Sequence, residues 1–114
     1  MPIYTPPLRD MQFVMHELLH VVDELAACPR HADVDEATMN AIVEEAGRFA
    51  AEVVFPLNAS GDLEGCALDR STRTVRTPRG FKEAYHKFIE GGWPALAVDP
   101  EYGGQGLPVV LNQC

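Results

Sequence analysis

Apolar residues recur three and four positions apart in three stretches of the chain, which places them along one side of an α-helix. The first stretch runs from Asp10 to Ala27 and the second from Asp35 to Phe55. The third follows Thr77 and ends before Gly91. This spacing predicts an all-α fold made of three amphipathic helices plus the start of a fourth.

The apolar stripes define the predicted core. They comprise Met11, Val14, Met15, Leu18, Val21, Val22 and Leu25 in the first helix, Met39, Ile42, Val43, Ala46, Phe49, Ala50 and Val53 in the second, and Phe81, Ala84, Tyr85, Phe88 and Ile89 in the third. Trp93 and Leu96 follow the third helix and are also predicted to be core residues.

Proline and capping residues predict where the helices begin and end. Asp33 or Asp35 is expected to cap the second helix, and Pro56 either ends or kinks that helix. Thr77 is the predicted N-cap of the third helix, with Pro78 at its first position. Pro108 is expected to open the fourth helix.

The helical spacing breaks down between the second and third helices. Glycine, aspartate, serine and threonine predict a loop from 61 to 76, with a short extended pair around 72–75. We divide the chain into an N-terminal extension carrying the first helix, residues 1–34, and a partial helical domain, residues 35–114.

Charge and cysteine content exclude several classes of protein. The net charge of −8, with nine Lys and Arg against 17 Asp and Glu, disfavours binding to nucleic acids. No apolar run approaches the roughly 18 to 20 residues that span a bilayer, and no signal peptide is evident, so we expect a cytoplasmic protein. Cys28, Cys66 and Cys114 are too widely spaced to suggest a disulfide framework or a thiolate zinc site.

Residues 16–20 read HELLH and match the HExxH signature of zinc metalloproteases. In such a site His16 and His20 hold zinc while Glu17 activates a water molecule. On a regular helix, however, both histidines lie opposite the apolar stripe centred near Leu18 and face water. Because nothing in the sequence marks a third ligand, surface histidines are the favoured interpretation, and a zinc protease remains a weaker alternative.

The stretch DPEYGGQGLPVVLNQC, residues 99–114, contains three glycines within four residues. It does not complete a dinucleotide-binding GxGxxG pattern, because Val109 stands where the third glycine belongs. It also lacks the Gly-Lys-Ser/Thr of a phosphate-binding loop. We therefore predict a turn in which Gly103, Gly104 and Gly106 adopt conformations that only glycine reaches easily.

Four segments resemble consecutive parts of the N-terminal helical domain of flavin-dependent acyl-CoA dehydrogenases. GGWPALAVDPEYGGQGLP resembles the end of that domain, and TPRGFKEAYHKFIEGGW resembles the helix before it. AIVEEAGRFAAEVVFPLNASGD is similar to a long early helix, and YTPPLRDMQFVMHELL to an extension found in one branch of the family. The resemblance covers nearly the whole chain.

This resemblance implies a fragment of an FAD-dependent oxidoreductase of fatty-acid or related acyl metabolism. Such enzymes dehydrogenate acyl-CoA thioesters between the α and β carbons, with a glutamate base and most flavin contacts in later domains. No catalytic or FAD-binding residue is therefore expected in this chain. Expected partners are the remaining domains, acyl-CoA, an acceptor such as an electron-transfer flavoprotein, and further copies of the enzyme.

The resemblance further implies that these helices form part of the wall of the acyl-chain cavity. The loop with Tyr102, Gly103, Gly104 and Gly106 would lie toward that cavity. The alternative is a free-standing helical interaction module. A coding frame that continues beyond Cys114 into a β-rich segment would favour the dehydrogenase.

Overall fold

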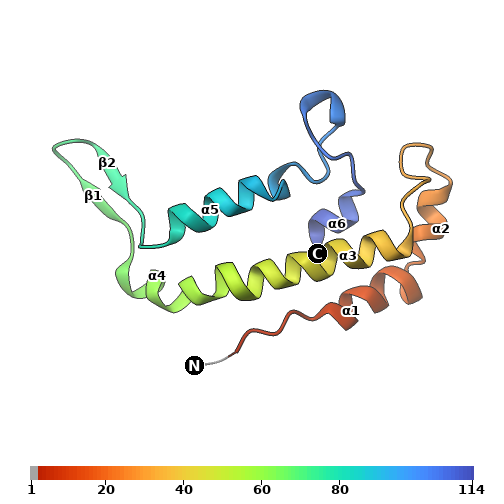
Figure 1. The fold of residues 1–114 in the computed structure, drawn as a ribbon, viewed down its shortest axis with the longest axis horizontal. Coiled ribbons are helices and arrows are strands. Elements are labelled where there is room, and N and C mark those ends of the chain that lie inside the picture. The colour runs from red at the N-terminus through yellow and green to blue at the C-terminus, as the bar shows by residue number, and fades with distance from the viewer. Residues whose placement is uncertain (1–2) are drawn as a thin grey trace.

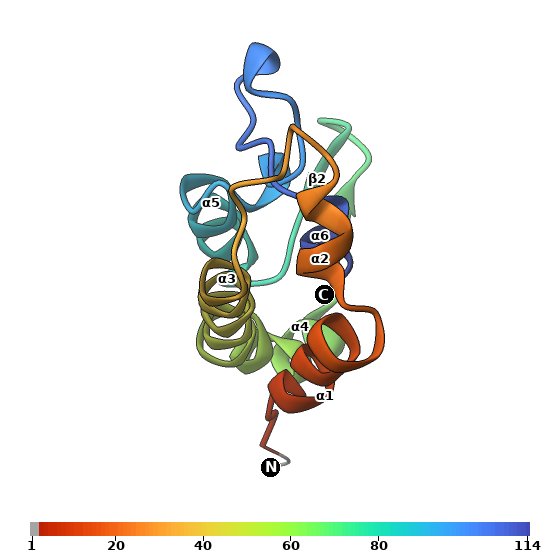
Figure 2. The same ribbon diagram turned by 90° about the vertical axis from the view of Figure 1, so that its right-hand side faces the viewer.

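Two antiparallel helical segments form the long frame of the molecule, as the computed structural model of residues 3–114 shows (Figure 1). The lower segment begins with α3 (Glu36–Phe49), and the upper one is α5 (Phe81–Glu90). Helices α1 (Leu8–Gln12), α2 (Val21–Ala26) and α6 (Val109–Gln113) lie to one side of α3 (Figure 2). The molecule is flat, with extents of 56 × 38 × 18 Å, and mostly helical, as predicted.

Short helices and one hairpin complete the chain. In order they are α1 (Leu8–Gln12), the π-helical turn η1 (Phe13–Leu18), α2 (Val21–Ala26), α3, the π-helical turn η2 (Ala50–Val54), the 3-10 turn η3 (Phe55–Leu57), α4 (Asn58–Glu64), β1 (Ala67–Asp69), β2 (Thr74–Arg76), α5, the 3-10 turns η4 (Trp93–Ala95) and η5 (Pro100–Tyr102), and α6 (Val109–Gln113).

The first predicted helix is interrupted, so the single helix expected over 10–27 is wrong. In η1 the amide of Leu19 donates to the carbonyl of Val14 at 2.9 Å, a bond that spans five residues. His20 then takes the left-handed conformation with φ +48° and separates η1 from α2. The wider turn rotates the residues after it. Leu18, placed at the centre of the predicted stripe, is exposed, whereas Met15, which was also predicted to be a core residue, is buried.

Pro56 does not end the second helical segment. The chain continues from α3 through η2 and η3 into α4, which ends at Glu64, so the predicted loop from 61 begins too early. Pro56 lies in the first turn of η3, where a missing amide hydrogen is tolerated. Gly61 lies within α4, and a side chain at this position would collide with Phe81, because an added Cβ would come within 2.5 Å of that ring.

The third helix begins later than predicted, whereas its end is as predicted. The expected N-cap Thr77 and first residue Pro78 lie outside α5, which starts at Phe81 after Gly80 with φ +87°. The reason is tertiary: the Arg79 amide donates to Glu64 at 2.9 Å, which holds this stretch against α4. After α5, Gly92 has φ +75° and stops the helix as expected.

The predicted extended pair is an antiparallel hairpin. Strands β1 and β2 place Leu68 directly opposite Val75, so the hairpin begins several residues before the predicted range. The Asp69 carboxylate accepts the amide of Ser71 at 2.8 Å and closes the turn. Glu64 anchors the base of the hairpin through Arg76, whose Nη1 lies 2.9 Å from Oε1.

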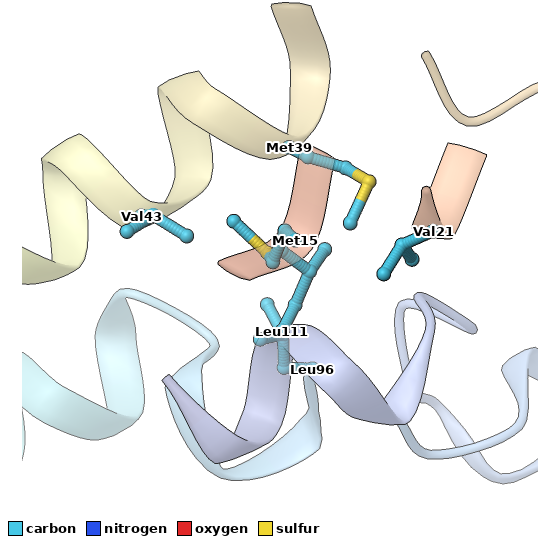
Figure 3. Close-up of a cluster of buried hydrophobic side chains, with 6 residues drawn as sticks. All are labelled: Met15, Val21, Met39, Val43, Leu96 and Leu111. Carbon is cyan, nitrogen blue, oxygen red and sulfur yellow. The ribbon is translucent and has the colours of Figure 1, made fainter. Parts of the chain in front are cut away.

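Six buried side chains from five segments form the core. Figure 3 shows them pointing toward one another from η1, α2, α3, the segment after η4, and α6; they are Met15, Val21, Met39, Val43, Leu96 and Leu111. Beside this core, His16 Nε2 and Asn40 Oδ1 are 2.7 Å apart and link η1 to α3. Predicted core residue Trp93 is partly buried against it.

The predicted stripe on the third helix packs only at its edge. Helix α5 contains no buried residue, and Tyr85 and Ile89 are exposed. Phe88 approaches Phe49 of α3, with ring centroids 6.2 Å apart. The spacing identified a real apolar face, but the described residues leave most of that face uncovered.

Across residues 3–114, no helix combines the length and apolar character required to cross a membrane.

We expect Met39→Ala to lower the free energy of unfolding by about 2–5 kcal/mol, because it opens a cavity in the centre of the core. Met39 is fully buried, whereas Leu63 in α4 is 88% exposed. Leu63→Ala is the control and should change stability by less than about 0.5 kcal/mol. Urea denaturation followed by circular dichroism measures both, and equal effects would contradict this core.

Glu64 accepts hydrogen bonds from Arg76 and from the Arg79 amide at the base of the hairpin. These bonds predict that the attachment of the hairpin to α4 depends on pH. Hydrogen bonding from the Arg79 amide and then from Arg76 holds the pKa of Glu64 below 4.5. A lowered carboxylate pKa stabilises the folded state above the unfolded value, and the contribution is lost as pH falls through the folded pKa. An NMR titration of the Arg79 amide should therefore show an inflection below pH 4.5 that Glu64→Gln removes. An inflection at or above pH 4.5 would show that the bond is not formed.

Candidate functional site

An apolar cavity of about 450 Å³ lies where the N-terminal arm meets the end of the second helical segment and the start of α5. Its lining residues are Tyr4, Ala50, Val54, Phe55, Leu57, Asn58, Phe81 and Ala84. Only the Tyr4 hydroxyl and the Asn58 amide supply polar side-chain atoms. A cavity of this size and composition suits a hydrocarbon chain.

Local structure explains how the cavity forms. The Tyr4 ring stacks on Phe55, with centroids 5.9 Å apart and planes at 29°, so the arm closes one side. The π-helical turn η2 places Ala50 and Val54 on the lining. Across the cavity Phe81 rests against Gly61, where a larger residue would displace the ring.

The loop that contains Gly103, Gly104 and Gly106, the glycine loop, forms a hydrogen-bonded turn, as predicted. Gly103 and Gly106 have φ +83° and +64°, which only glycine adopts easily. Gly104 is required for a different reason: a Cβ there would lie 2.0 Å from the carbonyl oxygen of Val98. At the start of the loop, Asp99 accepts the Glu101 amide at 2.9 Å and pairs with Arg30.

This loop offers no backbone donors to a phosphate. Five consecutive amides donate to carbonyls of the same segment, at distances of 2.9–3.1 Å: Gly103 to Pro100, Gly104 to Asp99, Gln105 to Ala95, Gly106 to Val98 and Leu107 to Leu96. None of the four predicted loop residues, Tyr102, Gly103, Gly104 and Gly106, lines the apolar cavity. Their predicted position toward a substrate cavity of the larger enzyme stays a prediction.

The HELLH segment lacks the regular α-helix on which the HExxH zinc-binding arrangement depends. The π-helical turn and the left-handed His20 remove the regular helix that would place His16 and His20 on one face. The prediction that both histidines face water is wrong for His16, which is half-buried and hydrogen-bonded to Asn40. Within residues 3–114, no three His, Cys, Asp or Glu side chains come together as a metal site.

Shifted titratable groups lie away from the apolar cavity, and each shift has a local cause. A hydrogen bond from Thr38 lowers the pKa of Asp35, one from Ser71 lowers the pKa of Asp69, and one from the Glu101 amide lowers the pKa of Asp99. Burial raises the pKa of the Cys114 thiol. None of these groups lines the apolar cavity, and its lining contains no carboxylate, histidine, lysine or arginine.

Comparison with known proteins identifies relatives over nearly the whole chain. It is 36% identical over 109 residues to 3-methylmercaptopropionyl-CoA dehydrogenase of Ruegeria pomeroyi, covering 96% of this chain and 18% of the relative. It is 30% identical over 105 residues to the broad-specificity linear acyl-CoA dehydrogenase FadE5 of Mycobacterium tuberculosis, covering 92% and 17%. Butyryl-CoA dehydrogenase of Syntrophomonas wolfei is 28% identical over 111 residues, covering 94% and 18%. No protein-family model matches the chain.

Over nearly its whole length the chain is similar to one segment of acyl-CoA dehydrogenases, consistent with a fragment of such an enzyme, as the sequence resemblance indicated. It spans less than a fifth of the length of the relatives it matches. The match therefore concerns one mostly helical segment of such an enzyme.

Sequence reasoning missed the residues of the apolar cavity. It assigned Phe81 and Ala84 to the core and treated the residues before the first helix only as an extended arm. The stacking of Tyr4 on Phe55 joins residues about fifty positions apart, which periodicity within one helix does not reveal. The sequence signal that could have indicated this cavity is the position of Tyr4, Phe55 and Phe81, which are aromatic residues near the ends of the predicted helices.

We expect Gly104→Ala to destabilise the chain by about 2–3 kcal/mol, because the added methyl group collides with the Val98 carbonyl. Gly103 has no atom within 4 Å of an added Cβ, and asparagine tolerates its left-handed backbone. Gly103→Asn should therefore cost less than about 1 kcal/mol. Thermal denaturation compares the two variants, and the reverse order of stability would refute the described packing of the loop.

Proposed function

We propose that this segment forms part of the wall that receives the acyl chain in an FAD-dependent acyl-CoA dehydrogenase. The observation that carries the proposal is the apolar cavity of about 450 Å³, lined by aliphatic and aromatic side chains with few polar atoms. Burying each methylene of an acyl chain in such surroundings contributes about 0.8 kcal/mol. The names of the relatives, all acyl-CoA dehydrogenases, support a thioester with such a chain as the substrate.

In this proposal the segment binds the acyl chain and excludes water from it. The chemical steps take place at residues in other parts of the enzyme. FAD would accept the hydrogen removed at the β carbon after a base takes the α proton. The described residues do not fit a flavin site: the amides of the glycine loop are already used, and the cavity lacks charged groups. The base and the FAD contacts are therefore assigned to sequence beyond these 114 residues.

The glycine loop with Tyr102, Gly103, Gly104 and Gly106 is assigned a supporting role at the edge of the complete substrate cavity. Its rigidity supports this assignment, because internal hydrogen bonds hold the backbone and leave the Tyr102 side chain 78% exposed. The exposed apolar face of α5 would pack against the rest of the enzyme. We further propose a cytoplasmic homo-oligomeric enzyme that passes electrons to an acceptor such as an electron-transfer flavoprotein.

Calorimetry with dodecanoyl-CoA and with free CoA tests the cavity. The acyl thioester should bind the chain more tightly than CoA, and Ala84→Phe should weaken that binding about tenfold or more by filling the space. Ala41→Phe is a matched control, because Ala41 is an exposed residue of α3 outside the cavity. Equal binding of the thioester and CoA, or equal effects of both variants, would refute the acyl-wall proposal.

The proposal that the catalytic base and the FAD contacts lie outside these residues has a separate test. The chain mixed with FAD and acyl-CoA should stay colourless after gel filtration and show no dehydrogenase turnover. A yellow, active preparation would show that the base and flavin site lie within these residues.

A further inference from the structure

Positive charge is concentrated in one stretch of this acidic protein. Arginine occupies every third position from Arg70 to Arg79, and Lys82 follows, with no acidic residue between 70 and 82. The rest of the chain contains only four of the nine cationic residues and all 17 acidic residues. We call residues 70–82 the cationic segment.

The cationic segment begins at the apolar cavity and leads away from it. Arg79 and Lys82 lie within two residues of Phe81, which lines the cavity and is 39% exposed. From there the chain runs through β2 to the tip of the hairpin at Arg73, which projects at one end of the longest axis (Figure 1). Positions 73 and 81 are eight residues apart. Their α carbons are therefore at most about 29 Å apart, so a long ligand with one end in the cavity can follow the segment.

Most of the cations in this segment are available to a ligand. Arg76 is paired with Glu64, with 2.9 Å between Nη1 and Oε1. The exposed side chains of Arg70, Arg73 and Arg79 make no ion pair within residues 3–114. A guanidinium group can donate two parallel hydrogen bonds to a phosphate, so these three residues suit a ligand with several phosphate groups.

The carboxylates next to the cationic segment do not cancel its charge. Hydrogen bonds from the Arg79 amide and from Ser71 lower the pKa of Glu64 and Asp69, respectively, so both are ionised at neutral pH. Residues 64–82 still contain five cations against these two anions. Charges farther away are screened over about 8 Å at physiological ionic strength. The net charge of the whole chain therefore does not prevent an anion from binding here.

A hollow of about 320 Å³ lies on the hairpin. Its lining residues are Ala67, Leu68, Asp69, Thr74 and Arg76. The bonds that close the turn all end on Oδ1 of Asp69, so within residues 3–114 its Oδ2 accepts no hydrogen bond. A guanidinium plane can stack on a flat nucleobase, and a free carboxylate oxygen can accept from an exocyclic amino group. Adenine offers both the ring and the amino group.

These features follow one another in the order of the parts of an acyl-CoA. That molecule consists of an acyl chain, a pantetheine arm, a pyrophosphate, a ribose with a 3′-phosphate, and adenine. Along this chain the apolar cavity is followed by Arg79 and Lys82, then by the hollow at Arg76, and then by the tip. The order favours an acyl-CoA over inorganic phosphate or a lipid surface, because neither of these joins a hydrocarbon chain to a nucleobase.

We propose that the cationic segment and the hollow on the hairpin bind the 3′-phosphoadenosine diphosphate part of an acyl-CoA. Arg79 and Lys82 bind its pyrophosphate, and Arg70 and Arg73 bind its 3′-phosphate. Adenine occupies the hollow. The proposal rests on the acyl-wall function for the position of the acyl chain, whereas the charge of the segment and the hollow do not depend on that function.

Calorimetry with three ligands separates the acyl site from the nucleotide site. Dodecanoyl-pantetheine lacks the nucleotide, adenosine 3′,5′-bisphosphate lacks the acyl chain, and dodecanoyl-CoA contains both. The unchanged chain should bind dodecanoyl-CoA about tenfold or more tightly than dodecanoyl-pantetheine. Arg73→Gln with Arg79→Gln should weaken the binding of dodecanoyl-CoA and of the bisphosphate about tenfold, and should leave dodecanoyl-pantetheine within about twofold.

Two further variants control for general charge and test the hollow. Arg48→Gln with Lys87→Gln removes the same charge from exposed positions outside the cationic segment and should leave binding of all three ligands within about twofold. Ala67→Trp fills the hollow. It should weaken the bisphosphate about tenfold and leave inorganic pyrophosphate within about twofold. Circular dichroism confirms that each variant is folded.

Equal binding of dodecanoyl-CoA and dodecanoyl-pantetheine by the unchanged chain would overturn the proposal, as would equal losses in the arginine variant and its charge control. Pyrophosphate bound as tightly as the bisphosphate would show an anion patch without a nucleotide site. Failure of the acyl wall gives a different result. Dodecanoyl-pantetheine would then not bind, whereas the bisphosphate would still bind and would still require Arg73 and Arg79.

Discussion

The packing of the N-terminal segment onto α3 is the contact on which the rest of the structure depends. Met15 and Val21 meet Met39 and Val43, and the same cluster is closed from the other side by Leu96 and Leu111. Since these side chains come from distant parts of the chain, the core forms only when all of these segments assemble. The His16 contact with Asn40 then sets the position of η1 along α3.

Two departures from regular α-helix give this small protein its candidate site and its surface. The π-helical turn η2 places Ala50 and Val54 on the apolar cavity. The π-helical turn η1, followed by the left-handed His20, buries Met15 and separates the two histidines of HELLH. Each wide turn costs some helix stability and is retained where packing offsets that cost.

The surfaces left uncovered have distinct chemistry. The face of α5 and the cavity beside it are apolar, which is the basis of the acyl-wall proposal. The hairpin of β1 and β2 instead carries arginine side chains and projects at one end of the longest axis (Figure 1).

The sequence by itself determined the helical class, the amphipathic stripes, the stop at Gly92, the glycine turn and the relationship to acyl-CoA dehydrogenases, because these depend on local spacing and local backbone preference. Only the tertiary structure decided the break at His20, the continuation past Pro56, the late start of α5 at Phe81 and the lining of the cavity. Those features arise from contacts between residues far apart in the chain, such as Arg79 with Glu64 and Tyr4 with Phe55. Such contacts override local propensity, so no pattern within a single helix could have revealed them.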